Sequence, residues 1–174
     1  RLAQHLTREP EKSRQNLHSC SPFQFLTLIS IMFNKMLTWT EKLHVKKDWK
    51  VVSLEKKFAD MPVNCKMLVV TPLIVNAYIR DIPSGTSISF AEMRDDLARQ
   101  YQAEKTCPVS TGIFLRISAE AAYEEFQLIR SDKKITPFWR AIDQNMNVAK
   151  KLTCGISFIN ERRLREGIES NITS

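Results

Sequence analysis

Among the side chains suited to covalent chemistry, Cys107 has the most distinctive position. It is followed by Pro108 and then by a segment of helical character. A thiol at the start of a helix loses its proton more readily, because the helix dipole stabilises the nucleophilic thiolate. No histidine lies near it in the sequence that could act as its base, since the three histidines are His5, His18 and His44. The pattern therefore favours a structural thiol over a nucleophile.

A second candidate site is the run 136–140, where a proline precedes two aromatic residues and an arginine. The rings of Phe138 and Trp139 can stack on any nucleic-acid base, a contact that contributes about 1–3 kcal/mol. Two aromatic residues after a proline can equally fill a hydrophobic core. Arg140 can contact a phosphate or form an internal ion pair with Glu166. The sequence leaves both alternatives open for the aromatic pair and for the arginine.

Basic side chains provide a third kind of chemistry, the binding of phosphates. The chain has 26 Lys and Arg against 19 Asp and Glu, a formal net charge of +7, which tolerates a polyanionic partner without requiring one. Candidate contacts lie in the first turns of a helix that begins near residue 111 and on both sides of a predicted hairpin. The predicted DNA-binding residues are Ser110, Thr111, Gly112, Arg116, Lys133, Lys134, Arg140, Lys150 and Lys151.

Several other kinds of site are not expected. The four cysteines have no C-x-x-C spacing and the histidines lie early, so we predict no metal site and no cofactor. Four glycines argue against a glycine-rich phosphate loop. The apolar run from Phe23 to Phe33 is shorter than the roughly 20 residues that a membrane span needs. We therefore expect a cytoplasmic protein with free thiols and no membrane partner.

Hydrophobic periodicity predicts the helices that would position these residues. A helix over 72–82, with proline at its first position, should end at Pro83-Ser84-Gly85. Ser89 and Glu92 form a capping box for the next helix. A longer helix is expected over 111–129, capped by Ser110, with a buried stripe that consists of Ile113, Ile117 and Ala121, together with Phe114 and Leu128.

The remaining segments are predicted more coarsely. Residues 39–62 alternate basic, aromatic and aliphatic types, with a short helix over 53–59 capped by Ser53 and a β-prone run at 67–70. Residues 135–142 should be extended, 143–147 should form the polar turn of a hairpin or wing, and 156–165 should form the last helix. Two helices joined by a short turn, with basic residues nearby, are typical of a helix-turn-helix.

In this order and spacing, the segments resemble the DNA-binding domain of the O6-alkylguanine-DNA alkyltransferases and alkyltransferase-like proteins, the methylated-DNA-protein cysteine methyltransferase family of DNA repair. The resemblance covers about residues 72–168, and it extends back to about Trp39 in a bacterial branch with an aromatic-Trp-Arg site. The matching runs are Pro83-Ser84-Gly85, Ile88-Ser89-Phe90, Ser110-Thr111-Gly112, Pro137-Phe138-Trp139-Arg140 and Leu164-Arg165-Glu166-Gly167.

Departures from the family pattern bear on activity. Phe138 and Trp139 stand where the family has its nucleophilic cysteine and the following histidine. Val109 replaces the family's base-flipping arginine, and Phe90 replaces a tyrosine that presses on the target phosphate. Without a thiolate and its base, the family's alkyl transfer is not expected. The resemblance instead implies a pocket formed by Phe90, Pro137, Phe138 and Trp139.

The sequence therefore predicts a mostly α (α+β) fold, a winged helix-turn-helix with a small hairpin over 36–174, preceded by a disordered or loosely packed extension over 1–35. The predicted function is non-enzymatic binding of duplex DNA, with recognition of altered bases and a repair protein as partner. Two alternatives are an alkyltransferase that uses Cys107 and a winged-helix interaction module without DNA binding.

Overall fold

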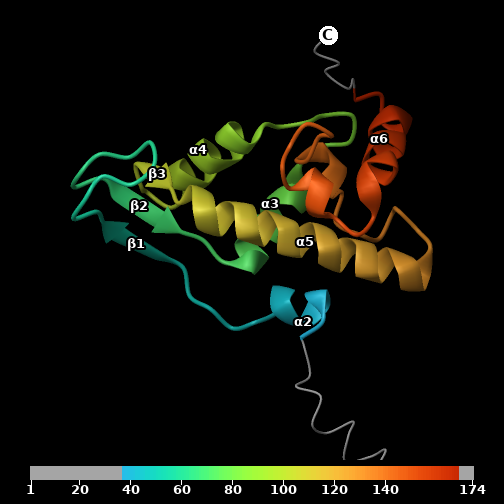
Figure 1. Cartoon of the computed structure of the whole chain (residues 1–174), viewed down its shortest axis with the longest axis horizontal. Coiled ribbons are helices and arrows are strands. Elements are labelled where there is room, and N and C mark those ends of the chain that lie inside the picture. Colours follow the sequence, from blue (N-terminus) through green and yellow to red (C-terminus); the bar gives the residue numbers. More distant parts are fainter. Residues whose placement is uncertain (1–36, 169–174) are drawn as a thin grey trace, which may run out of the picture. The chain divides into compact units, whose positions relative to one another are not determined.

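A computed structural model of the protein describes residues 37–168. This part of the chain is a mixed α+β structure with five α-helices, two short 3₁₀ helices and one small sheet (Figure 1). In chain order the elements are α2 (Trp39–Leu43), β1 (Lys50–Ser53), β2 (Lys66–Val69), α3 (Pro72–Asp81), α4 (Phe90–Gln100), β3 (Lys105–Thr106), α5 (Pro108–Ile129), η1 (Phe138–Arg140), η2 (Ala149–Lys151) and α6 (Gly155–Arg165).

The sheet has the strand order β1-β2-β3. β1 pairs antiparallel with β2, with Lys50 opposite Val69. β2 and β3 are parallel, with Met67 opposite Lys105, and the connection between them contains α3 and α4. β3 leads directly into α5. The backbone N–H of Cys107 still donates to the Leu68 carbonyl of β2, 2.8 Å away, and the next residue, Pro108, is the first of the helix.

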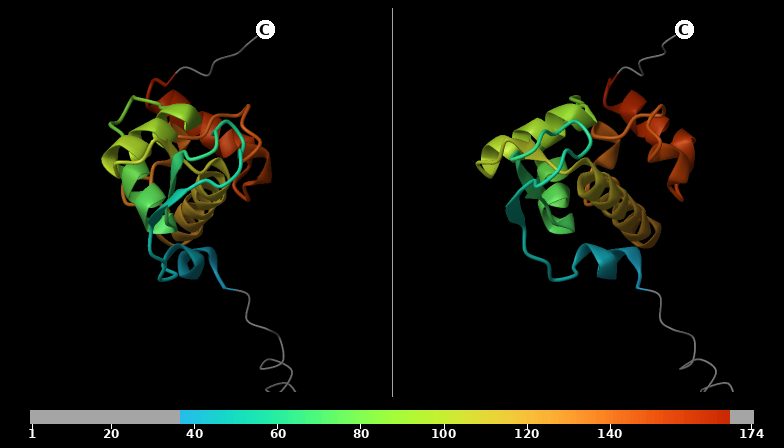
Figure 2. Two further views of the ribbon diagram at one scale, coloured as in Figure 1. Left: turned by 90° about the vertical axis from the view of Figure 1, so that its left-hand side faces the viewer. Right: turned by 60° about the vertical axis from the view of Figure 1, so that its left-hand side comes forward.

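The 22-residue helix α5 is the element around which the others are arranged. α2 and α3 both pack on it, and η1 contacts it as well (Figures 1 and 2). At its C-terminal half the rings of Tyr123 and Phe126 meet Phe158 of α6, each with ring centroids 5.1 Å apart. A helix of this length spans about 33 Å, so its two ends can carry quite separate surfaces.

The main core joins these helices to one another. Its completely buried side chains include residues of β2, α3, α4, α5, η1 and α6, namely Leu68, Val75, Ile79, Met93, Leu97, Ala119, Phe138 and Ile159. A second, smaller cluster lies beside the sheet and contains Met61, Cys65, Met67 and Cys107. Apolar burial of this extent is the main source of stability for the fold.

Two predicted helix starts are confirmed. The Thr71 hydroxyl accepts a hydrogen bond from the Ile74 N–H, and Pro72 takes the first position of α3. At α4 the capping box is complete: the Glu92 N–H donates to Ser89 Oγ, and the Ser89 N–H donates to Glu92 Oε2. Each bond satisfies an N–H that the helix itself leaves without a partner.

The start of α5 differs from the prediction. The helix begins at Pro108, so Ser110 lies inside its first turn and does not cap it. Its hydroxyl instead donates to the Cys107 carbonyl. The predicted buried stripe is also wrong in part: Ile113 and Leu128 are exposed, whereas Leu115 and Ala119 are buried. α5 is covered from several directions, by α2, α3 and η1, so no single stripe describes its buried face.

The predicted helix over 53–59 is wrong. Val51 and Val52 belong to the strand β1, which ends at Ser53. The segment after Ser53 turns back towards β2. Ala59 has a φ of 52°, and Phe58 and Met61 form an isolated bridge. Pairing with β2 outweighs the local helical preference, because β-branched residues fit a pleated strand well.

The wing was predicted around 143–147, and no hairpin is present there. Asp143 Oδ1 instead accepts hydrogen bonds from the N–H groups of Asn145 and Met146, which folds the segment into a tight turn. Residues 138–140, predicted as extended, form the 3₁₀ helix η1. The antiparallel strand pair of the described chain is β1 with β2, which lies between α2 and α3 in the sequence.

Residues 1–35, predicted to be a separate extension, lie outside the described residues. Within residues 37–168 there is no helix both long enough and apolar enough to cross a lipid bilayer.

Candidate functional site

The aromatic pair of the run 136–140 belongs to the core. Phe138 is 0% exposed and Trp139 is 3% exposed. The Phe138 ring is stacked on that of Phe158, with centroids 6.0 Å apart and planes 3° from parallel. Pro137 is buried as well, and Phe90 is half-buried against the same core. Of the two alternatives for these rings, the structure therefore shows the core role.

Arg140 forms an internal ion pair with Glu166. Arg140 Nε lies 2.8 Å from Glu166 Oε2, its Nη2 lies 2.9 Å from Oε1, and its Nη1 donates to the Ile82 carbonyl. The same carboxylate accepts hydrogen bonds from Trp139 Nε1 and from the Gly85 N–H. Burial by itself raises the pKa of Glu166, but the hydrogen bonds from Arg140, Trp139 and Gly85 outweigh it and hold the pKa below its usual value.

A cavity of about 420 Å³ lies beside this ion pair. Pro137 and Trp139 are among its lining residues, although Trp139 exposes very little surface there. Most of the lining is charged, and the ionisable groups around it are Arg80, Asp132, Lys133, Lys134, Arg140 and Glu166. This space is a polar recess and does not have the aromatic walls of a base-stacking site.

An open, largely apolar groove lies along the N-terminal half of α5, and we call it the α5 groove. Its volume is about 840 Å³. Residues from α2, from the first turns of α5 and from the segment around η2 form its walls: Trp39, Pro108, Val109, Gly112, Ile113, Arg116, Ile117, Asn147, Val148 and Lys151. Val109 and Ile113 are 55% and 53% exposed.

Cations surround the aromatic wall of the α5 groove. Lys42 Nζ lies 4.0 Å from the centre of the Trp39 ring, and the guanidinium of Arg116 lies 5.3 Å from it. Arg116 is held in place by Glu120 at 3.7 Å and by the Lys151 carbonyl at 3.2 Å. A groove with apolar and aromatic walls and a cationic rim can accept an anionic polymer.

The predicted DNA-binding residues do not form one surface. Gly112, Arg116 and Lys151 line the α5 groove, and Lys150 is exposed in the same 3₁₀ turn as Lys151. Thr111 is completely buried, and its hydroxyl donates to the Cys107 carbonyl 2.7 Å away. Because α5 starts three residues earlier than predicted, Thr111 points into the core.

The other predicted contacts lie elsewhere. Lys133, Lys134 and Arg140 surround the cavity beside Glu166, after the C-terminal end of α5. The two lysine pairs therefore do not flank one hairpin, since the hairpin that would have joined them is not present. Trp39 and the Lys42 side chain over its ring were not predicted to belong to the site. The alternation of basic and aromatic residues that begins at Trp39 was the signal that could have indicated them.

Cys107, the candidate nucleophile, is 8% exposed and packs with Met61, Cys65 and Met67. It lines neither the cavity beside Glu166 nor the α5 groove. Burial raises the pKa of the Cys154 thiol to about 11, which keeps it protonated at neutral pH. Within residues 37–168 no three His, Cys, Asp or Glu side chains come together in a way that could hold a metal ion.

No protein-family model, no curated protein and no solved structure matches this chain. The function must therefore be inferred from the groove, the cavities and the charges described above.

Proposed function

We propose that this chain is a non-enzymatic, duplex-DNA-binding protein of the alkyltransferase-like type, and that the α5 groove is its contact surface. The proposal combines the family resemblance of residues 72–168 with the α5 groove, a large surface groove that joins apolar walls to cationic side chains. Stacking of a base on Phe138 or Trp139 is not part of this function, because both rings are buried.

Gly112 is the observation that supports the proposal most directly. It lies inside α5, where glycine is less favourable than alanine by about 0.5–1 kcal/mol. A Cβ added at this position would meet Phe90 Cζ at 3.9 Å, which is an ordinary contact, so packing does not require a glycine. A missing side chain on a groove wall permits close approach of a partner's backbone, as at a sugar-phosphate chain.

The surroundings of Gly112 fit the same partner. Lys150 and Lys151 are exposed and form no ion pair within the described residues, so both are free to meet phosphates. Val109 and Ile113 contribute exposed apolar surface to the groove that Trp39 and Lys151 also line. Proteins that enter the minor groove use this combination, with apolar side chains against base steps and cations on the flanking phosphates.

The experiment is a fluorescence-anisotropy titration of a short labelled duplex over a series of salt concentrations. Wild-type protein should bind, and its log K should fall linearly with log salt. Ile113→Glu places a negative charge in the α5 groove at an exposed position and should abolish binding without changing Tm. Leu164→Glu is the matched control, because Leu164 is 80% exposed on α6 and lines none of the cavities described here. Binding that survives Ile113→Glu would show that the contact surface is not the α5 groove.

The second candidate function is a protein-interaction module without DNA binding, and the exposure of Val109 and Ile113 favours it. Two large apolar side chains on one wall are typical of protein interfaces as well as of minor-groove contacts. In this case no duplex should bind in a salt-dependent way, and Ile113→Glu should instead weaken association with a protein partner.

A further inference from the structure

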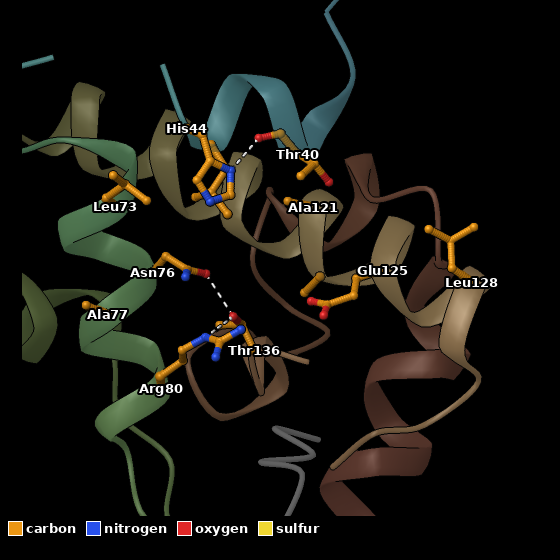
Figure 3. Close-up of a pocket in the computed structure, with 12 residues that line it drawn as sticks. Thr40, His44, Leu73, Asn76, Ala77, Arg80, Ala121, Glu125, Leu128 and Thr136 are labelled. Carbon is orange, nitrogen blue, oxygen red and sulfur yellow. Dashed lines mark hydrogen bonds between the residues drawn. The ribbon is translucent and has the colours of Figure 1, made fainter. Parts of the chain in front are cut away.

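A third cavity, of about 710 Å³, lies between α2, α3 and α5 and is distinct from the α5 groove (Figure 3). Sites for small molecules are typically about 300–1,000 Å³ and combine apolar walls with a few polar groups. This cavity has that composition. Its apolar lining consists of Leu43, Leu73, Ala77, Ala121, Ala122 and Leu128, and its polar lining consists of Thr40, His44, Asn76, Arg80, Glu125 and Thr136.

The cavity exists because small side chains face one another across it. Ala77 of α3 and Ala121 and Ala122 of α5 leave space between two helices that pack together. α2 closes one side and is tied to α5 by Glu124, whose Oε2 accepts hydrogen bonds from the Thr40 N–H at 2.8 Å and the Thr40 hydroxyl at 2.7 Å. His44 Nδ1 donates to the Thr40 carbonyl and is thereby fixed at the edge of the space.

Arg80 is held in position at the cavity by two successive hydrogen bonds through Thr136. Its Nε donates to Thr136 Oγ1 at 2.9 Å, and that hydroxyl donates in turn to Asn76 Oδ1 at 2.8 Å. Thr136 is almost completely buried, whereas Arg80 is exposed. Both terminal nitrogens of the guanidinium have no protein partner among the described residues. Fixing an exposed arginine in this way is not needed for the stability of the fold. A carboxylate-binding site does need it, because the two parallel N–H groups of the guanidinium must already be oriented when the carboxylate arrives.

Glu125 supplies the opposite charge. It is half-buried on α5, and its carboxylate forms no hydrogen bond or salt bridge within residues 37–168. Figure 3 shows the Glu125 carboxylate and the Arg80 guanidinium facing the same space from α5 and α3. The two groups do not pair with each other, so each is available to a ligand that enters between them.

We propose that this cavity binds a small zwitterion, an amino acid or an ω-amino acid, with its carboxylate on Arg80 and its ammonium group on Glu125. The guanidinium fork matches a carboxylate with two parallel hydrogen bonds, and Glu125 accepts from the ammonium group. The hydrocarbon part of the ligand lies against Leu73, Ala77 and Ala121. A molecule with one charge would leave the other group without a partner.

The test is isothermal titration of the whole chain with a series of zwitterions that differ in the spacing of their charges: glycine, leucine, β-alanine, γ-aminobutyrate, δ-aminovalerate and ε-aminocaproate. Butyrate and butylamine are the single-charge controls. At least one zwitterion should bind, and it should do so at least about tenfold more tightly than either control, since a hydrogen bond to a charged group contributes about 1.5–3 kcal/mol.

Arg80→Gln and Glu125→Gln should each weaken that binding by about tenfold or more. Arg130→Gln is the matched control, because Arg130 is exposed at the end of α5 and does not line the cavity. Absence of binding by every zwitterion would overturn the proposal. So would equal binding of butyrate with no effect of Glu125→Gln, which would indicate a simple anion site, or binding that survives both substitutions. None of these outcomes depends on DNA, so the failure of one proposal is distinguishable from the failure of the other.

Discussion

At Glu166 a single carboxylate accepts hydrogen bonds from Trp139 Nε1, from two nitrogens of Arg140 and from the Gly85 N–H. These donors come from two segments far apart in the sequence, the turn before α4 and the 3₁₀ helix η1. Trp139 combines two functions in this arrangement, since its ring fills the core while its one N–H is satisfied. The charged residues here stabilise the fold and are not free for a ligand.

Glu166→Gln should lower the free energy of unfolding by about 2 kcal/mol at neutral pH, because hydrogen bonds to a charged acceptor contribute about 1.5–3 kcal/mol. The pKa of Glu166 is lowered in the folded state, so the stability it provides is fully present above its usual pKa of 4.5 and is lost as the pH falls through the folded value. Urea unfolding at a series of pH values should therefore show the difference between wild type and Glu166→Gln shrinking on acidification.

The control for this prediction is Glu161→Gln on α6. Glu161 also pairs with arginines, Arg162 and Arg165, but its side chain is 53% exposed. Exposed ion pairs contribute about 0–1 kcal/mol, so this substitution should have little effect. An equal loss in both variants would show that the Glu166 ion pair has no special role in stability.

Among the elements, α5 determines where most of the candidate surfaces lie. Its N-terminal half forms a wall of the α5 groove, and its C-terminal half forms a wall of the cavity that Glu125 lines. Its start at Pro108 is set by the parallel pairing of β3 with β2, which delivers the chain to the helix. If the chain entered α5 three residues later, other side chains would face the α5 groove and the cavity, since successive residues are rotated by about 100° around a helix.

Gly112→Ala separates the contribution of α5 to folding from its contribution to binding. The variant should be more stable by about 0.5–1 kcal/mol, which raises Tm by about 1–4 °C for a chain of this size. It should bind duplex DNA more weakly, because the added methyl group lies on the groove wall. Thermal unfolding and the anisotropy titration measure the two effects.

The control is Gln127→Ala, at an exposed position near the other end of α5, which should leave binding unchanged. If Gly112→Ala loses stability, the glycine is needed by the fold after all.

At the scale of the whole molecule, the net charge of +7 attracts a polyanion at long range. The salt dependence of binding is different, because only lysines and arginines that contact phosphates release the counterions of the DNA. The described structure separates two exposed lysine pairs that the sequence had assigned to one surface. Lys150 and Lys151 belong to η2 beside the α5 groove, whereas Lys133 and Lys134 line the cavity near Glu166.

We therefore expect the two pairs to behave differently. Replacing Lys150 and Lys151 by alanine should weaken binding of all duplex sequences and reduce the salt slope by about two, roughly one for each lost phosphate contact. Replacing Lys133 and Lys134 removes the same charge from the molecule and serves as the control, so its slope should stay close to that of wild type. A larger effect from the second pair would move the DNA-contact surface to the cavity beside Glu166.

Features that depend on neighbouring residues could be predicted from the sequence. The Ser89–Glu92 capping box and the start of α3 at Thr71-Pro72 were predicted correctly, because both are decided by side chains within a few residues of the backbone groups that they satisfy. The last helix was predicted from its local sequence as well, although no side chain caps its start. The mixed α+β class followed from the same local patterns.

Features that depend on distant partners could not be predicted in this way. The strand at residues 50–53 exists because β2 pairs with it, and the turn at 143–147 leaves no hairpin between the two lysine pairs. Burial of Trp139 requires a carboxylate 27 residues away to accept its N–H. The α5 groove and the cavity with Arg80 and Glu125 depend on how α2, α3 and η2 pack around α5. Packing and long-range hydrogen bonds are decided by the whole chain at once, so only the tertiary structure could bring these side chains together.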